Sequence, residues 1–333
     1  MKIMTQVNTQ KFEKKDIAIE VTDLKKHFGN VKAVDEISFK IKRGECFGFL
    51  GPNGAGKTTT INLIACYLKP DAGKAYVAGY DVVKDPSEVK KHIGISPQEN
   101  IFYEELSVYE NVIFFGKMYN IDRKVLKQRA EDLIKKVGLE DKRKTRSEKL
   151  SGGMKRRLNL IIGLVHDPDI LFLDEPTAGL DPQTRRLIWD YIFELKSRNK
   201  TIFLTTHYMD EADILSDRLA IIDYGKIIAE GTPEHLKETI GKGDLLNLKI
   251  EGPKEELIKG INEVKQFDYV LDASYIEDEM ITRIKAMDGL GKIGEILKTL
   301  TGDGKKLQVI DVGVQRNSLE NVFLALTGRS LRE

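Results

Sequence analysis

Two patterns of hydrophobic residues alternate along the chain up to about residue 231. Short apolar runs, rich in β-branched and aromatic residues, are typical of strands that are buried on both faces. Helical spacing follows one of these runs, over residues 57–68. The alternation predicts an α/β fold with a parallel sheet at its core. The runs are IAIEV, ISFKI, CFGFL, DILFLDE, TIFLTTH and RLAIID, which begin at residues 17, 37, 46, 169, 201 and 218.

The strand pattern is interrupted between Pro97 and about Val165. Amphipathic helical segments fill that stretch, which predicts a helical subdomain of about residues 99–165 inserted into the α/β core. Another helix is expected further along, because Asp181 is a favourable N-cap and Pro182 suits the first helical position.

The pattern changes again after residues 237–244, KETIGKGD. The order strand, helix, strand, strand, helix, strand is the one that ferredoxin-like domains use, so a small α+β domain is expected. It shows no catalytic constellation, which favours a regulatory or dimerisation module. The expected strands are 245–251, 267–275, 280–285 and 306–313, and the helices are 254–264 and 291–300. The predicted domains are a polar N-terminal tail at 1–15, an α/β domain at 16–240 and the accessory domain at 244–333.

The charge balance argues against a partner that is bound through a strong overall field. Lys and Arg number 53 and Asp and Glu 52, for a net charge of +1. Two local basic runs, residues 141–146 and 155–157, are interpreted as solvated faces. No apolar stretch reaches the roughly 18 residues that a spanning helix needs, and the polar start of the chain is unlike a signal peptide. Cys46 and Cys66 lack metal-ligand spacing and are expected to be small core residues.

The most specific motif is GPNGAGKTT at residues 51–59, which matches the phosphate-binding pattern GxxxxGK[ST]. Its glycines allow backbone N–H groups to converge on phosphate oxygens at the start of a helix. Lys57 would reach the β- and γ-phosphates, and the Thr58 hydroxyl would bind Mg²⁺. A glycine-rich turn that fits by chance is the alternative, but the predicted strand before and helix after favour the phosphate loop. The phosphate-binding candidates are Gly51, Pro52, Asn53, Gly54, Ala55, Gly56, Lys57, Thr58 and Thr59.

Two carboxylates end the apolar run at residues 170–173. Asp174 is placed to hold Mg²⁺ through water, and Glu175 to act on the water that attacks the γ-phosphate. A strand followed by Asp-Glu usually marks only a strand end. Downstream of a phosphate loop, the pair becomes a candidate catalytic site.

His207 and Gln98 each follow another predicted strand. A histidine at a strand end is more often a surface or core residue. In a parallel sheet, however, it would reach the same edge as Lys57 and Glu175, where its imidazole could bond the γ-phosphate or the attacking water. Gln98 offers a neutral side chain that can sense Mg²⁺ or water.

Taken in order, these residues resemble the nucleotide-binding subunit of ATP-binding cassette (ABC) transporters, over about residues 16–240. The resemblance implies a P-loop NTPase core that binds ATP and Mg²⁺ and hydrolyses ATP. It assigns Phe28 to stacking on adenine, where many members have Tyr. It makes Gln98 the residue that links the nucleotide site to a membrane partner, Asp181 the D-loop residue and His207 the switch histidine.

The resemblance also explains SGG at residues 151–153, which begins a basic helix. In the family, two cassettes dimerise head to tail, and each signature motif completes the site begun by the other's phosphate loop. Ser151, Gly152 and Gly153 would then bind the γ-phosphate at a helix N-terminus. Met154 replaces the family's usual Gln and is expected to pack against the dimer partner. SGGMKRRL and the ending NSLENVFLALTGR resemble the branch whose partners export drugs, lipids or polysaccharides.

An ATPase subunit that drives a membrane permease is therefore the leading hypothesis, with a cytoplasmic location on the inner face of the cell membrane and no nucleic-acid partner. The alternative is a soluble cassette ATPase that acts on nucleic acid or ribosomes, although this chain lacks the heptad runs and metal modules common there. A nucleotide-gated protein without turnover is disfavoured by Glu175 and His207. Homodimer and heterodimer both remain open. The aromatic residues within 99–115 are assigned either to permease contact or to ordinary core.

Overall fold

The computed structural model describes residues 16–239, 243–277, 279–302, 305–315 and 318–328. The predicted N-terminal tail at 1–15 lies outside these residues. The chain forms two compact units that divide between Pro233 and Glu234. The division therefore falls at the first residue of the helix Pro233–Thr239, whereas the predicted boundary lay after that helix, at the change of sequence pattern.

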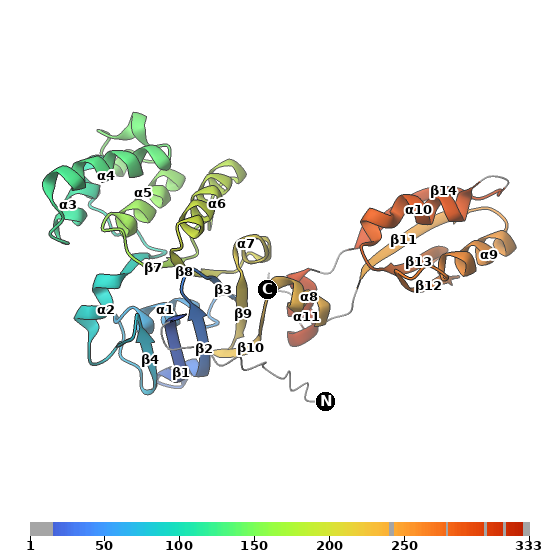
Figure 1. The fold of residues 1–333 in the computed structure, drawn as a ribbon, viewed down its shortest axis with the longest axis horizontal. Helices are drawn as coiled ribbons and strands as arrows, with labels where there is room; N and C mark the ends of the chain where they lie inside the picture. Colours follow the sequence, from blue (N-terminus) through green and yellow to red (C-terminus); the bar gives the residue numbers. More distant parts are fainter. Residues whose placement is uncertain (1–15, 240–242, 278, 303–304, 316–317, 329–333) are drawn as a thin grey trace. The chain divides into compact units, whose positions relative to one another are not determined.

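A six-stranded sheet forms the core of the first unit (Figure 1), in the order β10-β9-β3-β8-β7-β6. The five strands from β9 to β6 pair in parallel, and β10 is an antiparallel edge strand. These short runs are buried along almost their whole length, which explains their continuous apolar sequence. The strands are β3 (Cys46–Leu50), β6 (Ile93–Ser96), β7 (Ile170–Asp174), β8 (Thr201–Thr206), β9 (Arg218–Asp223) and β10 (Lys226–Gly231).

A second, antiparallel sheet of the first unit has the order β2-β1-β4-β5. It begins with the first two apolar runs, which form longer strands than their sequence patterns alone indicated. Its strands are β1 (Ile17–Phe28), β2 (Val31–Lys42), β4 (Ala72–Val77) and β5 (Tyr80–Asp81).

Helices replace strands between β6 and β7, which confirms the predicted inserted subdomain (Figure 1). Asp181 caps the following helix by accepting a hydrogen bond from the Thr184 N–H at 2.9 Å, also as predicted. The helix after the phosphate loop is shorter than expected and ends at Ile64, because Cys66 takes a left-handed conformation with φ +63°. The helices of this unit are α1 (Lys57–Ile64), α2 (Pro86–His92), α3 (Val108–Lys117), α4 (Arg123–Lys136), α5 (Gly152–Leu164), α6 (Pro182–Ser197) and α7 (Met209–Leu215), with short 3-10 turns at Glu140–Lys142 and Ser147–Lys149.

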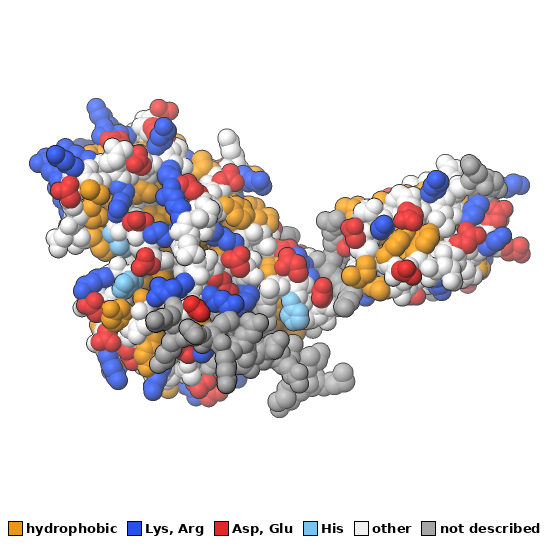
Figure 2. Space-filling view, viewed as in Figure 1, with side chains coloured by type: hydrophobic (Ala, Val, Ile, Leu, Met, Phe, Trp, Pro, Cys, Tyr) orange, Lys and Arg blue, Asp and Glu red, His pale blue; other side chains and the backbone are white. Residues whose placement is uncertain are grey.

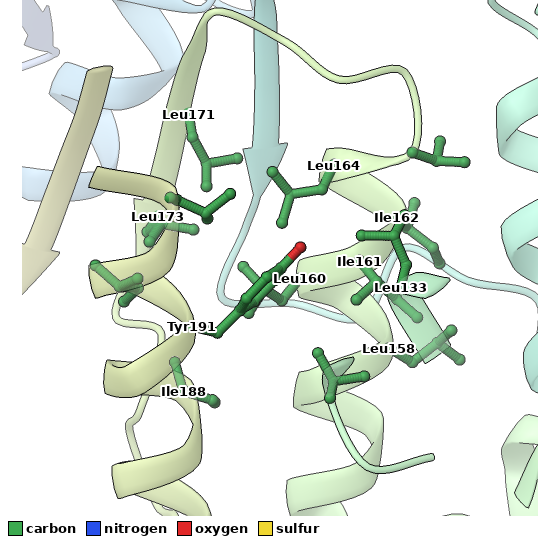
Figure 3. Packing of buried hydrophobic residues seen from close by; sticks show 14 of the residues in the cluster. Leu133, Leu158, Leu160, Ile161, Ile162, Leu164, Leu171, Leu173, Ile188 and Tyr191 are labelled. Carbon is green, nitrogen blue, oxygen red and sulfur yellow. The ribbon is translucent and has the colours of Figure 1, made fainter. Parts of the chain in front are cut away.

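Two hydrophobic clusters pack against the six-stranded sheet. One joins the sheet to the antiparallel sheet and α1, and it includes Phe39, Phe49 and Phe203. The other joins the sheet to the helical subdomain and α6 (Figure 3), where Leu171 and Leu173 of β7 meet Tyr191 of α6. The helical subdomain is thus packed against the sheet as an extension of the core.

The second unit contains an antiparallel sheet, β12-β13-β11-β14, and from β11 to β14 its strands and helices follow the predicted ferredoxin-like order. Residues of β11 alternate between buried Leu246, Leu248 and Ile250 and more exposed neighbours, so the helices cover one face of the sheet. The elements are α8 (Pro233–Thr239), β11 (Asp244–Glu251), α9 (Lys254–Val264), β12 (Val270–Ile276), β13 (Ile281–Ala286), α10 (Gly289–Thr301), β14 (Gln308–Gln315) and α11 (Leu319–Thr327).

Lysine and arginine side chains gather on the lobe that carries α3 to α5 (Figure 2). Most of residues 141–146 are exposed there, so their interpretation as a solvated face is confirmed. Across the described ranges, no helix has the length and apolar character needed to cross a membrane.

Candidate active site

The candidate residues lie at the carboxyl ends of four neighbouring parallel strands, β3, β8, β7 and β6. The phosphate loop follows β3, His207 follows β8, Asp174 ends β7, and Gln98 comes shortly after β6. This edge of an open α/β sheet is where ligands bind. The topology therefore brings together residues that are far apart in the sequence.

The phosphate loop has a backbone that only glycine adopts easily. Gly56 is the N-cap of α1 with φ +106°, and a Cβ there would lie 2.1 Å from the Ala33 carbonyl oxygen. Lys57 is 5% exposed, and its ammonium donates to the carbonyls of Gly51 and Pro52 at 2.9 and 3.0 Å. The loop thus folds around its own lysine at a helix N-terminus, an arrangement that suits phosphate.

Glu175 lies between two cationic or potentially cationic side chains. Its Oε1 is 3.1 Å from Lys57 Nζ and 3.2 Å from His207 Nδ1, although the imidazole lacks hydrogen-bond alignment. Burial by itself would raise the pKa of Glu175, but Lys57 and His207 together bring it below the usual value. The carboxylate is therefore ionised at neutral pH, as a general base must be.

The backbone at Glu175 is held in an unusual conformation, with φ +50°. Its N–H donates to the Thr205 carbonyl at 3.0 Å, and the Thr205 hydroxyl donates to Asp174 Oδ1. Left-handed backbone is disfavoured for a residue with a side chain, so these contacts must hold it. Thr205 was not among the residues that the sequence indicated.

Arg156 corrects the sequence analysis. It was placed on a solvated face, but it is 8% exposed and donates to the backbone carbonyls of Asp174, Glu175 and Pro176. It also donates to the Gln98 carbonyl at 3.2 Å, while the Gln98 residue is itself exposed. Burial lowers the pKa of Arg156, and Asp174 is the first of three carboxylates that oppose this. Five backbone acceptors compensate for the removal of its guanidinium from water.

Other candidates lie at the start of α5 and the end of β1. Ser151 caps α5 by accepting from the Met154 N–H at 3.4 Å, and both it and Gly152 are exposed. Met154 packs partly buried against the hydrophobic cluster of its own helical subdomain, which differs from the expected packing on a dimer partner. Phe28 ends β1 with 49% of its surface exposed, and the Lys26 ammonium lies over its ring, 5.6 Å from the centroid.

The chemistry of the site suits a metal that arrives with phosphate. Among the described residues, no group of three or more His, Cys, Asp or Glu side chains is arranged to hold a metal by itself. Magnesium usually takes one or two carboxylates together with substrate phosphates and water. Buried Asp174 and the exposed Thr58 fit that ligand set.

Glu211 is a further buried acid that the sequence analysis missed. It is fully buried in α7, and its Oε1 accepts from the Thr177 hydroxyl at 2.7 Å and the Trp189 indole at 3.2 Å. Among the described residues, none donates a hydrogen bond to its Oε2. Burial raises the pKa of Glu211, although its hydrogen bonds act in the opposite direction. The polar network links α7, just after His207, to the segment after Glu175.

Glu211→Gln is expected to flatten the pH dependence of stability. Because the pKa of Glu211 is raised in the folded state, the folded protein binds more protons than the unfolded chain, and its stability falls as pH rises above the unfolded pKa. Glutamine cannot ionise and keeps the acceptor. Urea unfolding followed by Trp189 fluorescence from pH 5 to 8 should show this; an unchanged pH slope would contradict the assignment. Glu211→Leu, which removes the acceptor, should be less stable at every pH.

The fold and this site define a cassette-type, phosphate-loop nucleoside triphosphatase. Residues 34–178 match the family model described as ABC transporter. The linearmycin resistance ATP-binding protein LnrL of Bacillus subtilis is 38% identical over 95% of this chain and 100% of its own length. The chain belongs to the ABC transporter family, as an ATP-binding subunit, and it is an ATPase.

Other relatives and solved structures agree. The daunorubicin/doxorubicin resistance ATP-binding protein DrrA of Streptomyces peucetius is 37% identical, over 93% of this chain and 92% of that protein. A solved ATP-binding subunit of an ABC transporter has a TM-score of 0.63 at 27% identity, covering 67% of this chain and 93% of that one. A dimeric ATP-binding cassette with ADP and phosphate has a TM-score of 0.60 at 26% identity, covering 64% and 98%.

Proposed function

We propose that this ATPase works as a head-to-tail dimer that hydrolyses MgATP and drives an exporting membrane permease. Lys57 binds the β- and γ-phosphates, Glu175 activates the attacking water, and His207 contacts the γ-phosphate. The magnesium ion is held by Thr58, Asp174 through water and Gln98, together with phosphate oxygens. Phe28 stacks on the adenine, and Ser151, Gly152 and Gly153 with Asp181 belong to the site of the opposite subunit.

The observation that carries this proposal is the position of Glu175 between Lys57 and His207 at the carboxyl edge of the sheet. A phosphate bound by the Lys57 ammonium would compete with the Glu175 carboxylate for that ammonium. The carboxylate would then be free to accept a proton from water. Ser151 and Gly152 at the start of α5 are exposed, so a second cassette can reach them.

Export is supported by the names of the relatives. They include antibiotic resistance proteins and the Nod factor export ATP-binding protein I of Rhizobium, which is 37% identical over 95% of this chain. The runner-up, a soluble cassette ATPase acting on nucleic acid or ribosomes, has no such support here. The proposed location is accordingly the cytoplasmic face of the cell membrane.

Two exposed aromatic residues of the helical subdomain supply the proposed permease contact. Phe102 is buried in the core, but Tyr103 and Phe114 are 49% and 36% exposed and stack edge to face at 5.0 Å. Exposed aromatic side chains next to one another are typical anchors of protein interfaces. The segment 99–115 therefore contributes to the core and also presents a surface next to Gln98.

Purification of the tagged protein from detergent-solubilised membranes tests this function. We expect an integral membrane protein to co-purify and to stimulate ATP hydrolysis. Tyr103→Ser with Phe114→Ser should reduce that recovery at least about 10-fold, the usual scale for loss of interface anchors, while ATPase activity alone stays within about twofold. Phe193→Ser, which removes an exposed aromatic ring on α6, is the control. Stimulation by DNA or ribosomes, with no membrane partner, would contradict the proposal.

A further inference from the structure

Arg156 occupies a buried position one turn into α5, the helix that begins with the exposed Gly152 and the half-buried Gly153. Its neighbour Arg157 is half-buried and donates to the carbonyls of Val137 and Gly138, inside the helical subdomain. The two arginines are adjacent in sequence but connect α5 to different parts of the fold.

Arg156 joins two separate segments at the catalytic edge. Towards β7, Nε donates to the Pro176 carbonyl at 3.0 Å, and Nη2 donates to the carbonyls of Asp174 and Glu175. Towards β6, Nη1 donates to the carbonyls of Pro97 and Gln98. A single planar group therefore fixes the Gln98 segment relative to the carbonyl of the residue proposed as general base.

The Gln98 segment is also fixed to α5 one turn further along the same face. Asn159 is fully buried; its Nδ2 donates to the Glu99 carbonyl at 2.6 Å, and its Oδ1 accepts from the Ile101 N–H at 3.1 Å. Beyond it, Gly163 lies so close to β6 that a Cβ there would be 2.6 Å from the Ile95 carbonyl oxygen. Segment 93–101 and α5 are thus packed as one body.

We propose that Arg156 is a positioning residue for hydrolysis, which aligns the Glu175 carboxylate only when α5 and the Gln98 segment are correctly placed. Glu175 has a left-handed backbone whose N–H is held by Thr205 and whose carbonyl is held by Arg156. Displacement of α5 would pull that carbonyl and rotate the side chain away from the reacting water. This inference rests on the proposed catalytic role of Glu175.

Arginine is required at this position because its donors diverge within one plane. Lysine keeps the charge, but its ammonium presents at most three donors from one point, so it cannot serve both segments as Arg156 does. Arg156→Lys should therefore weaken the alignment without removing the positive charge. ATP binding should persist, because the hydrogen bonds of Arg156 go to the backbone of segments 97–98 and 174–176 and not to the phosphate loop.

The test compares Arg156→Lys and Arg156→Gln with the matched control Arg157→Lys. We expect kcat of Arg156→Lys to fall about 10- to 100-fold, as for a misplaced catalytic group, with KM and the ATP dissociation constant within about threefold. Arg157→Lys should keep kcat within about threefold. If both Arg156 variants lose folded structure by circular dichroism, or if KM and kcat deteriorate together, the role of Arg156 is merely structural and the proposal is overturned.

A double-mutant cycle identifies the residue through which Arg156 acts. In a Glu175→Gln background, Arg156→Lys should change the residual rate less than about threefold, because there is no general base left to align. An equal loss in both backgrounds would overturn the coupling. If Glu175→Gln is slow but Arg156→Lys hydrolyses ATP normally, only this inference fails. A normal rate for Glu175→Gln would overturn the proposed function and the inference with it.

Discussion

Glu175→Gln is expected to hydrolyse ATP about 10²–10⁴-fold more slowly than the natural protein, which is the usual scale for loss of a general base. Glutamine preserves the size of the side chain but cannot accept a proton from water. ATP binding should be equal or tighter, because the carboxylate no longer competes with phosphate for the Lys57 ammonium. The variant should therefore accumulate as a dimer with ATP bound in both sites.

Light scattering with ATP and with ADP measures this accumulation. Glu175→Gln should double its mass with ATP only, while the natural protein returns to monomer as ATP is consumed. Lys57→Ala is the control, since loss of the charge-assisted phosphate contacts should remove both ATP binding and the dimer. A Glu175→Gln protein that stays monomeric with ATP and hydrolyses it at the normal rate would disprove the catalytic role.

The sequence was a good guide wherever local pattern and motif decide the structure. Continuous apolar runs became buried strands such as β7 and β8, and Asp181 with Pro182 began α6 as expected. Boundaries were less predictable. The strand expected at 267–275 begins at Val270, because the Val270 N–H turns back to the Phe267 carbonyl and the rings of Phe267 and Tyr269 stack.

The candidate site was predictable to the extent that parallel strands bring their carboxyl ends together. That rule placed Lys57, Glu175 and His207 at one edge, and the structure gives their contacts. It could not identify Arg156, because a run of three consecutive basic residues in a helix does not indicate which side chain points inward. Glu211 was missed for the same reason: its partners, Thr177 and Trp189, come from segments that only the tertiary fold brings beside it.

Gly152 provides the most selective test of the proposed dimer, because the space around it is open within its own chain. A Cβ built there meets no atom within 4 Å, so a side chain should not disturb the cassette itself. Aspartate in the first turn of α5 is even favourable to the helix dipole. In the proposed dimer, however, this position would face the γ-phosphate bound by the opposite subunit. Like charges in that partly dehydrated site oppose closure by several kcal/mol.

Gly152→Asp should therefore fold and bind ATP normally but fail to dimerise. ATP hydrolysis should fall at least about 100-fold, because the free energy of dimer closure becomes several kcal/mol less favourable. ATP affinity, mass by light scattering in the Glu175→Gln background and thermal stability separate these properties. Met154→Gln, two residues further along the same turn, is the control. Met154 packs on its own helical subdomain, so glutamine should lower the free energy of unfolding by about 1 kcal/mol and leave ATPase activity within several-fold. If Gly152→Asp hydrolysed ATP normally and Met154→Gln were inactive, the proposed role of the glycines in binding the γ-phosphate would be wrong. The methionine side chain, and not the glycines, would then be needed for activity.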